Sequence, residues 1–195
     1  MIADVLAVLG AYALGTFPTG VLVAKKEGHE VLDEGSGNPG ASNVYRVAGF
    51  RAGAVVLIGD LLKGVIAASV GYAVGGREVA LVCGLAAVVG HCFPLQRWGK
   101  GGKGVAAAGG MALVLFPVVS IVLTAVWFLI ARVLNKASLG SLVIAVAAPI
   151  GVALMGKPAR EVALMAVVCL LVIARHHANI RRLLKGEEGS LRSPA

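Results

Sequence analysis

The chain has 195 residues, of which 58% are apolar and only 14% are charged, and its mean hydropathy is +0.87. A soluble domain carries about 25% charged residues, so this composition excludes a soluble enzyme, a disordered tail and a disulfide scaffold. At roughly 150 residues per domain the length corresponds to one domain, residues 1–195. The composition predicts an all-α integral membrane protein built from packed helices.

The net charge of +8 points to anionic partners. Aromatic residues are only 5% and no basic stripe lies on a soluble surface, so no nucleic acid partner is expected. In a membrane protein, excess Lys and Arg set the topology and attract anionic substrates or lipid headgroups. We therefore expect contacts with membrane lipids, and the sequence indicates no obligate protein partner.

Seven apolar runs divide the chain, at residues 3–23, 52–74, 79–96, 105–116, 118–134, 139–155 and 160–175. The fourth and fifth runs are contiguous, so the count could also be six, but Pro117 between them ends or kinks a helix. With seven spans and the N-terminus outside, 14 of the 18 Lys and Arg lie inside, whereas six spans divide them almost evenly. The positive-inside rule therefore favours seven spans with a cytoplasmic C-terminus. The fourth and fifth are shorter than a full crossing and predict a short or tilted hairpin.

This topology places three polar segments on the cytoplasmic face, at about residues 33–51, 97–104 and 175–188. The first contains GSGNPGASNVYR over residues 35–46. Asn38 is predicted as the N-cap of a short helix with Pro39 as its first residue. The free amides of Gly40 and Ala41 would then form an anion site at the positive end of the helix.

The same segment supplies further donors around that site. Ser42 and Asn43 are four and three residues before Arg46, so the three side chains can share a helix face. Ser36, followed by Gly37, can donate from the glycine turn. The alternative is a capped interfacial helix after a flexible turn.

The second segment, WGKGGKGV at residues 98–105, combines two lysines with four glycines. It is not a Walker A loop, because no Ser or Thr follows the lysine and no strand precedes it. Its backbone and ammonium groups can still cradle a phosphate. Gly102 and Lys103, at the start of the next helix, are the candidate ligands, and an ordinary positively charged loop is the alternative.

The third segment begins where the last apolar run ends. If that helix continues into the cytoplasm, Arg175, His176, Asn179 and Arg182 fall on one face. A His and an Asn there could orient a hydroxyl or a phosphate. The alternative is an amphipathic basic tail on anionic lipid.

Other polar residues lie within or beside the spans. Asp60 and Lys63 are three residues apart in the second span, where an ionisable residue is a functional candidate, but we favour a structural pair that neutralises itself. His91 is interpreted as structural, and Ser141 begins the sixth span near the inner face. The few Asp residues form no cluster for a two-metal site, so no metal and no cofactor are expected. HxxxxD and GxSxG motifs are also absent from the sequence.

Seven motifs follow one another from about residue 15 to residue 188, namely GTFPTG, GSGNPGASNVYR, GDLLKG, VGHCFP, GKGGKGVA, SLGS and RHHANIRRLLKGEE. Together they resemble the bacterial acyl-phosphate:glycerol-3-phosphate acyltransferases, the PlsY family. The resemblance implies a seven-span enzyme of the bacterial inner membrane with its site facing the cytoplasm. It would transfer a fatty acyl group from acyl phosphate to the 1-hydroxyl of glycerol 3-phosphate, giving lysophosphatidic acid and phosphate.

The resemblance also implies which residues act. The expected catalytic residues are Ser36, Arg46, His176 and Asn179, and the expected substrate-binding residues are Gly37, Asn38, Gly40, Ser42, Asn43, Gly102, Lys103 and Ser141. Leu32 and Gly99 depart from the family pattern, which usually has an arginine and an aromatic residue there.

A transporter of a phosphorylated metabolite is the competing function. Seven spans with small residues and cationic loops would suit it, but the halves show no internal repeat and the polar motifs share one face. A lipid-binding subunit without catalysis would leave the shared face of His176 and Asn179 unexplained.

Overall fold

The structure is a computed structural model that describes residues 1–97 and 99–191. The described residues form helices joined by turns and loops. The helices are α1 (Ile2–Gly15), α2 (Thr19–Lys26), α3 (Ala41–Cys92), the short 3-10 helix η1 (Leu95–Arg97), α4 (Val105–Leu115), α5 (Pro117–Leu134), α6 (Ala137–Leu154), α7 (Ala159–Arg175) and α8 (His177–Leu184). Trp98 of the predicted second segment and Arg192 of the predicted tail lie outside the described residues.

The first apolar run, predicted as one helix, is broken between α1 and α2. Pro18 lacks a backbone N–H and cannot continue the helical hydrogen bonds, so the carbonyls before it need other partners. The Thr16 carbonyl accepts from Gln96 Nε2 at 2.9 Å and from Arg97 Nη2 at 3.1 Å. The Phe17 carbonyl accepts from Lys63 Nζ at 2.8 Å. Side chains that are distant in sequence therefore donate hydrogen bonds to the carbonyls at this break.

Helix α3 is 52 residues long but reverses direction at two glycines. Gly49 has φ 85° and Gly76 has φ 70°, a left-handed region that is open to glycine without strain. The side chains of Asp60 and His91 lie 3.6 Å apart, whereas a straight helix would separate these residues by about 46 Å. The predicted second and third runs are therefore two antiparallel arms of α3.

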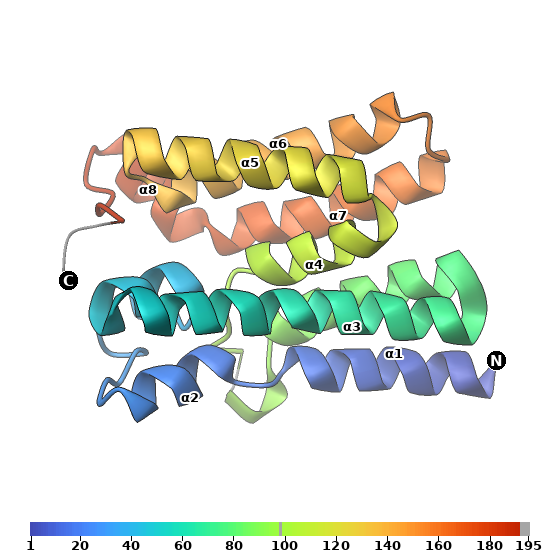
Figure 1. Ribbon diagram of the computed structural model, residues 1–195, viewed down its shortest axis with the longest axis horizontal. Coiled ribbons are helices and arrows are strands. Elements are labelled where there is room, and N and C mark those ends of the chain that lie inside the picture. Colours follow the sequence, from blue (N-terminus) through green and yellow to red (C-terminus); the bar gives the residue numbers. More distant parts are fainter. Residues whose placement is uncertain (98, 192–195) are drawn as a thin grey trace.

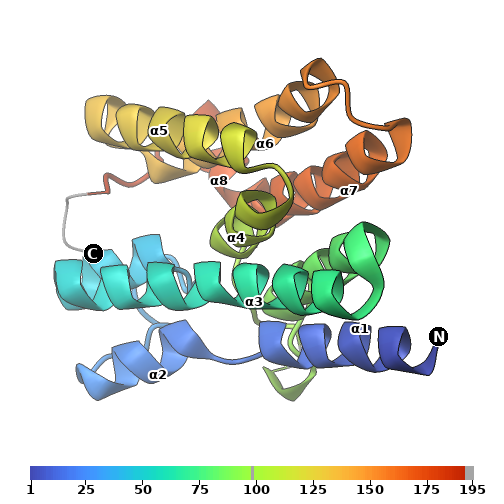
Figure 2. The same cartoon turned by 45° about the vertical axis from the view of Figure 1, so that its right-hand side comes forward.

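The helices form two layers with α4 between them. Figures 1 and 2 show α1, α2 and α3 on one side and α5, α6 and α7 on the other. The main apolar core joins both layers through buried residues such as Val88, Met111, Phe116, Val152 and Val168. Helix α4 has 11 residues, a length of about 17 Å. It is shorter than a hydrocarbon core of about 30 Å, in agreement with the prediction that the fourth run is a short span.

The outer surface of the bundle is apolar. Leu6, Leu9, Ile58, Leu129 and Leu170 are 59–64% exposed, as expected of side chains that face lipid. Four helical stretches are long and apolar enough to cross a membrane, or five if the bent pair α7–α8 is one span. The stretch Ala41–Arg97 counts once among these, although the chain reverses within it. The molecule is an all-helical integral membrane protein.

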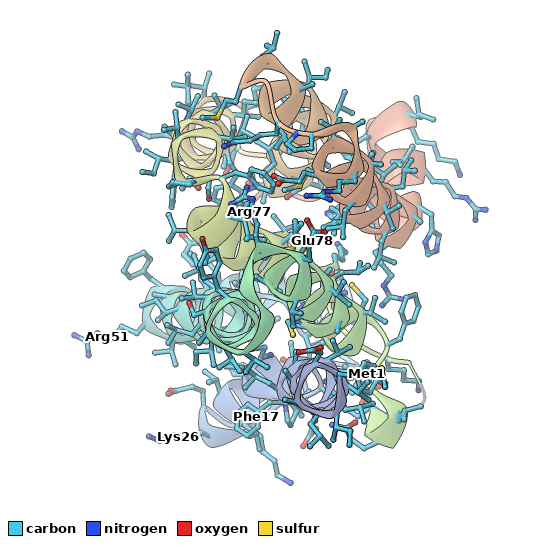
Figure 3. All side chains as sticks on the ribbon, turned by 90° about the vertical axis from the view of Figure 1, so that its right-hand side faces the viewer. Met1, Phe17, Lys26, Arg51, Arg77 and Glu78 are labelled. Carbon is cyan, nitrogen blue, oxygen red and sulfur yellow. The ribbon has the colours of Figure 1, made fainter. Side chains whose placement is uncertain are left out.

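The bundle has two different ends. Figure 1 places the N-terminus, the second reversal of α3 (residues 75–76) and the turn between α6 and α7 at one end. Helices α2 and α8 and the turn between α5 and α6 lie at the other end. At the first end, Arg77 donates to both carboxylate oxygens of Glu161, at 2.8 and 2.7 Å, and to the Leu115 carbonyl. Arg160 and Glu78 form a second, exposed ion pair. Figure 3, viewed from this end, shows Arg77 and Glu78 on α3. These pairs join the two layers.

Candidate functional site

Asn43 organises the first polar segment. Its side chain is only 2% exposed and donates through Nδ2 to the carbonyls of Val31 and Glu34, at 3.3 and 3.0 Å. Its Oδ1 accepts from the Ser36 backbone N–H at 2.9 Å and from Arg46 Nη2 at 3.3 Å. A substrate-binding candidate thus has its own polar atoms occupied, and it fixes the positions of Ser36 and Arg46.

Arg46 joins α3 to the loop before it. Its Nη2 also donates to the Ser36 hydroxyl at 3.3 Å, which brings two predicted catalytic residues into contact. The predicted pairing of Asn43 with Arg46 is confirmed, while Ser42 lies half-buried at the start of α3. Ser36 and Gly37 are exposed, so the loop presents a hydroxyl and backbone at the surface of the site.

The predicted N-cap is wrong by two residues. Helix α3 begins at Ala41 with Gly40 as its N-cap, and Pro39 precedes the helix. Asn38 Oδ1 instead accepts from the Gly40 N–H at 3.0 Å, a turn that Asn side chains commonly make with the amide two residues on. The expectation of an unpaired Gly40 amide is therefore also wrong.

The second segment is held from three directions. The Gly102 N–H donates to the His91 carbonyl at 3.0 Å. Arg175 donates to the carbonyls of Gly102 and Gly101, at 3.1 and 2.9 Å. Asn38 Nδ2 lies 3.5 Å from the Gly101 carbonyl, so the first and second segments are neighbours. Arg175, predicted to share a face with His176, binds this loop instead.

The third segment does not continue as a straight helix. Helices α7 and α8 are bent by 60° at His176, which contradicts the predicted continuous face. At the bend, His176 Nδ1 donates to the Val172 carbonyl at 2.7 Å at the end of α7. His176 and Asn179 are nevertheless both buried, at 2% and 4% exposure.

His176 is neutral and presents one nitrogen to the site. A carbonyl only accepts hydrogen bonds, so Nδ1 carries the proton and Nε2 is left as an acceptor. Burial beyond the end of α7, together with the nearby Lys103 charge, lowers the pKa of His176 to about 4 despite the opposing hydrogen bond to the Val172 carbonyl. At neutral pH the imidazole can therefore accept a hydrogen bond from a hydroxyl.

Glu188 closes the site from the C-terminal segment. Its carboxylate accepts from Asn179 Nδ2 at 2.6 Å and from Arg182 Nε at 2.7 Å. Burial alone would raise the pKa of Glu188, but the hydrogen bonds from Asn179 and Arg182 and the Arg182 charge help to hold it below the usual value. Because Nδ2 faces the carboxylate, Asn179 Oδ1 points elsewhere, and it is buried without a partner in the described part of the chain. It is an acceptor that a bound hydroxyl would satisfy.

Positive charge converges on this point from separate parts of the chain. Lys103 interacts electrostatically with Glu188, Arg182 and Arg46, and burial lowers its pKa to about 8. Gly189 lies beside Arg46, because a Cβ there would be 3.6 Å from Nη1. One buried carboxylate faces several cations, so the site carries an excess of positive charge that suits phosphate.

Ser141 lies on α6, one turn beyond Ser138. Its hydroxyl donates to the Ala137 carbonyl and accepts from Trp127 Nε1, both at 3.0 Å. The side chain is 5% exposed. Its contacts are thus with α5 and its own helix.

Sequence reasoning missed two residues that shape the site. Glu188 was part of the motif RHHANIRRLLKGEE, but no spacing rule distinguishes it from the adjacent Glu187. The spacing of Arg175 indicates only that it shares a helix face with His176, and not that it binds the glycine-rich loop. In both cases the decisive contact is with a residue or backbone group brought near by folding.

Known proteins resemble this chain over nearly its full length. The profile of the family described as "Glycerol-3-phosphate acyltransferase" matches residues 5–186. Curated proteins of that name from Rubrobacter xylanophilus and Syntrophotalea carbinolica are 41% and 43% identical, and each alignment covers 95% of this chain and 94% or 96% of the relative. A crystal structure of PlsY (YgiH), an integral membrane glycerol 3-phosphate acyltransferase in its glycerol 3-phosphate form, superposes with a TM-score of 0.91 at 36% identity and covers 96% of this chain and 94% of its own. The lysophosphatidic acid form gives 0.89.

Proposed function

The chain belongs to the glycerol-3-phosphate acyltransferase family, and from that premise we propose that its acyl donor is acyl phosphate and its acceptor is the 1-hydroxyl of glycerol 3-phosphate. The protein is a PlsY-type acyltransferase of phospholipid synthesis, which favours the enzyme over the transporter. The observation that supports the proposal is a cationic phosphate site together with two acceptors, His176 Nε2, whose ring is oriented by its Nδ1 bond to Val172, and the buried, unpartnered Asn179 Oδ1.

The phosphate groups bind to the first and second segments. Arg46 and Lys103 hold the glycerol phosphate, since both are half-buried cations and lie within electrostatic reach of each other. A charge-assisted hydrogen bond is about twice as strong as a neutral one. In the first segment the hydroxyls of Ser36 and Ser42 hold the acyl phosphate. Gly37, Asn38, Gly40 and Asn43 shape the loop around it through their own hydrogen bonds, and Ser141 lies on the α6 side.

The glycerol hydroxyl lies between His176 and Asn179. It attacks the acyl carbonyl, the bond from the carbonyl carbon to the phosphate oxygen breaks, and inorganic phosphate leaves. No acyl-enzyme is needed, because acyl phosphate is already activated. Phosphate has a second pKa of about 6, so it is a stronger base than His176, whose pKa is about 4. The hydroxyl proton therefore passes to phosphate, while His176 orients the hydroxyl.

The proposed topology has seven spans within one domain, with the N-terminus outside the bacterial inner membrane and the site facing the cytoplasm. It rests on the charge distribution. Figure 1 shows the reversal of α3 at residues 75–76 and the turn between α6 and α7 at the end of the bundle that holds the N-terminus. Arg77 follows that reversal, and Lys157 and Arg160 belong to that turn and the start of α7, whereas the first and third cationic segments adjoin α2 and α8 toward the other end. The acyl chain would reach the site from the lipid.

The reaction is expected to be independent of metal ions. Within residues 1–97 and 99–191, no group of three or more His, Cys, Asp or Glu side chains could hold an ion. Assays with excess EDTA should therefore retain full activity. Strong inhibition that added Mg²⁺ reverses would contradict this expectation.

Lys103→Ala is expected to raise KM for glycerol 3-phosphate by about 10- to 100-fold, with a much smaller effect on kcat. The Lys103 ammonium is expected to bind the substrate phosphate equally well in the ground state and in the transition state, so its removal weakens binding without slowing the chemical step. Lys100→Ala, at the exposed lysine of the same loop, is the matched control and should leave KM unchanged. An unaltered KM in Lys103→Ala would move the phosphate elsewhere.

KM for glycerol 3-phosphate is expected to depend on pH because of the same lysine. Because burial lowers its pKa to about 8, Lys103 is charged below pH 8 and loses its proton as the pH rises through that value. KM for glycerol 3-phosphate should therefore increase between pH 7.5 and 9, where the substrate phosphate is already fully ionised. Lys103→Arg should abolish this increase, since arginine remains charged.

Phosphate release from palmitoyl phosphate by the purified protein in lipid is the primary test. We expect release that depends on glycerol 3-phosphate, with formation of lysophosphatidic acid. Acyl-CoA should not replace the donor. Acyl transfer from acyl-CoA alone would overturn the proposed donor but not the family assignment.

A further inference from the structure

Beneath the glycine-rich loop lies a buried charge cluster to which the proposed reaction gives no role. Asp60 and Lys63 are 3% and 4% exposed, and Asp60 Oδ1 is 2.6 Å from Lys63 Nζ, which confirms the predicted pair. Lys63 also donates to the Phe17 carbonyl at the break between α1 and α2. The Asp60–Lys63 pair is thus held both by its own helix, α3, and by the backbone at the α1–α2 break.

His91 connects this cluster to the loop. Its Nδ1 lies 3.6 Å from Asp60 Oδ1, and the opposite edge of the ring faces Gly102. A Cβ added at Gly102 would lie only 2.0 Å from His91 Nε2. The Gly102 N–H in turn donates to the His91 carbonyl. Both the backbone and the side chain of His91 therefore contact the residue next to Lys103.

The space around the cluster is too small for a substrate. The cavity lined by Asp60, Lys63, His91, Arg97 and Gly102 has a volume of about 10 Å³, close to the space of one water molecule. Neither glycerol 3-phosphate nor a phosphate group fits there. The contact of His91 with Gly102 is the direct connection from these residues to the proposed phosphate site.

We propose that His91, braced by the Asp60–Lys63 pair, is a positioning residue that holds the Gly101–Lys103 loop in its phosphate-binding conformation. The ring acts as a fixed wall against Gly102, which explains why this position has no side chain. Asp60 and Lys63 fix the ring because they are themselves tied to the α1–α2 break. The inference rests on the proposed role of this loop in binding glycerol phosphate.

A double-mutant cycle tests the contact. Gly102→Ala should raise KM for glycerol 3-phosphate by about tenfold or more, because its methyl group displaces the loop from the ring. His91→Ala should raise KM by about fivefold and change kcat by less than about threefold. Residues in contact deviate from additivity by roughly 2- to 150-fold, so the double variant should have a KM at least about fivefold below the product of the single effects. Additive effects would overturn the proposal.

Glu161→Gln is the matched control, because Glu161 is equally buried in an ion pair but lies at the opposite end of the bundle. It should lower Tm without changing KM. His91→Ala should instead change KM whether or not Tm falls. If both variants change KM in proportion to their loss of Tm, the role of His91 is general stability and the proposal fails.

Lys103→Ala, measured in parallel, separates this inference from the proposed function. An unchanged KM in that variant would remove the loop from the phosphate site. A raised KM there, with normal KM in His91→Ala, would overturn the inference alone. Asp60→Asn should reproduce the KM of His91→Ala and add nothing to it in the double variant. Independent, multiplicative effects would contradict the bracing role of Asp60.

Discussion

Replacing Arg46 with alanine is expected to reduce kcat/KM for glycerol 3-phosphate by about 1,000-fold or more. The guanidinium lies among Ser36, Asn43 and the cationic cluster, so the change removes a phosphate ligand and frees the Ser36 loop. The measurement is steady-state phosphate release by protein purified in lipid. Near-normal activity would remove Arg46 from the site.

Two further variants separate charge from geometry. Arg46→Lys keeps the charge but removes the rigid planar guanidinium, whose Nη2 donates to both Ser36 Oγ and Asn43 Oδ1, so it should retain only part of the activity. Arg51→Ala changes an exposed arginine on the same helix, whose side chain points away from the bundle (Figure 3). It should keep activity within about twofold of the unmodified enzyme. A large loss in Arg51→Ala would mean that net charge, not the position of Arg46, determines activity.

His176→Ala is expected to lower kcat by about 100- to 10,000-fold, the range associated with loss of a positioned acid, base or hydrogen-bonding group. The variant removes Nε2, the acceptor proposed to orient the hydroxyl, and also removes the Nδ1 hydrogen bond to the Val172 carbonyl. The adjacent His177 is exposed and bonds the Ala174 carbonyl, so His177→Ala is a matched control that should keep normal kcat.

The pH profile distinguishes the role of His176. With a pKa of about 4, the ring is neutral above that value and becomes charged as the pH falls through it. Its contribution to kcat should therefore be constant from pH 5.5 upward and decline only toward pH 4. A loss of kcat centred near pH 6.5 that disappears in His176→Gln would show an unshifted histidine and contradict the neutral form described above.

The amino-acid sequence predicted the helices well because an apolar run can be recognised from neighbouring residues alone. Each apolar run became helical, and the reversal at Gly76 separates the second and third runs as expected. The break at Pro18 was not predicted, although proline favours it. Its carbonyls are satisfied by Lys63, Gln96 and Arg97, and such distant partners cannot be recognised from neighbouring residues.

The sequence indicated which segments meet at the candidate site better than it indicated the hydrogen bonds between them. Arg46 and Asn43 pair as their spacing indicated, but the N-cap at Asn38 and the straight helix beyond Arg175 were wrong. Asn38 fits both a cap and a turn, and only the observed hydrogen bond to Gly40 distinguishes them. The bend after α7 lies at His176, which is buried and bonds the Val172 carbonyl, and the spacing of polar residues along the chain does not reveal it.

The position of Glu188 has a consequence for how the protein is made. Arg46, Lys103 and Arg182 leave the ribosome before the carboxylate that faces them, because synthesis proceeds from the N-terminus. A nascent chain with α1 to α8 already in the membrane therefore carries this positive charge uncompensated, and anionic lipid headgroups are the nearest source of neutralisation. Glu188, whose carbonyl also accepts from Lys136, supplies the carboxylate that faces these cations. The charge balance of the site is therefore complete only after residue 188 has been synthesised.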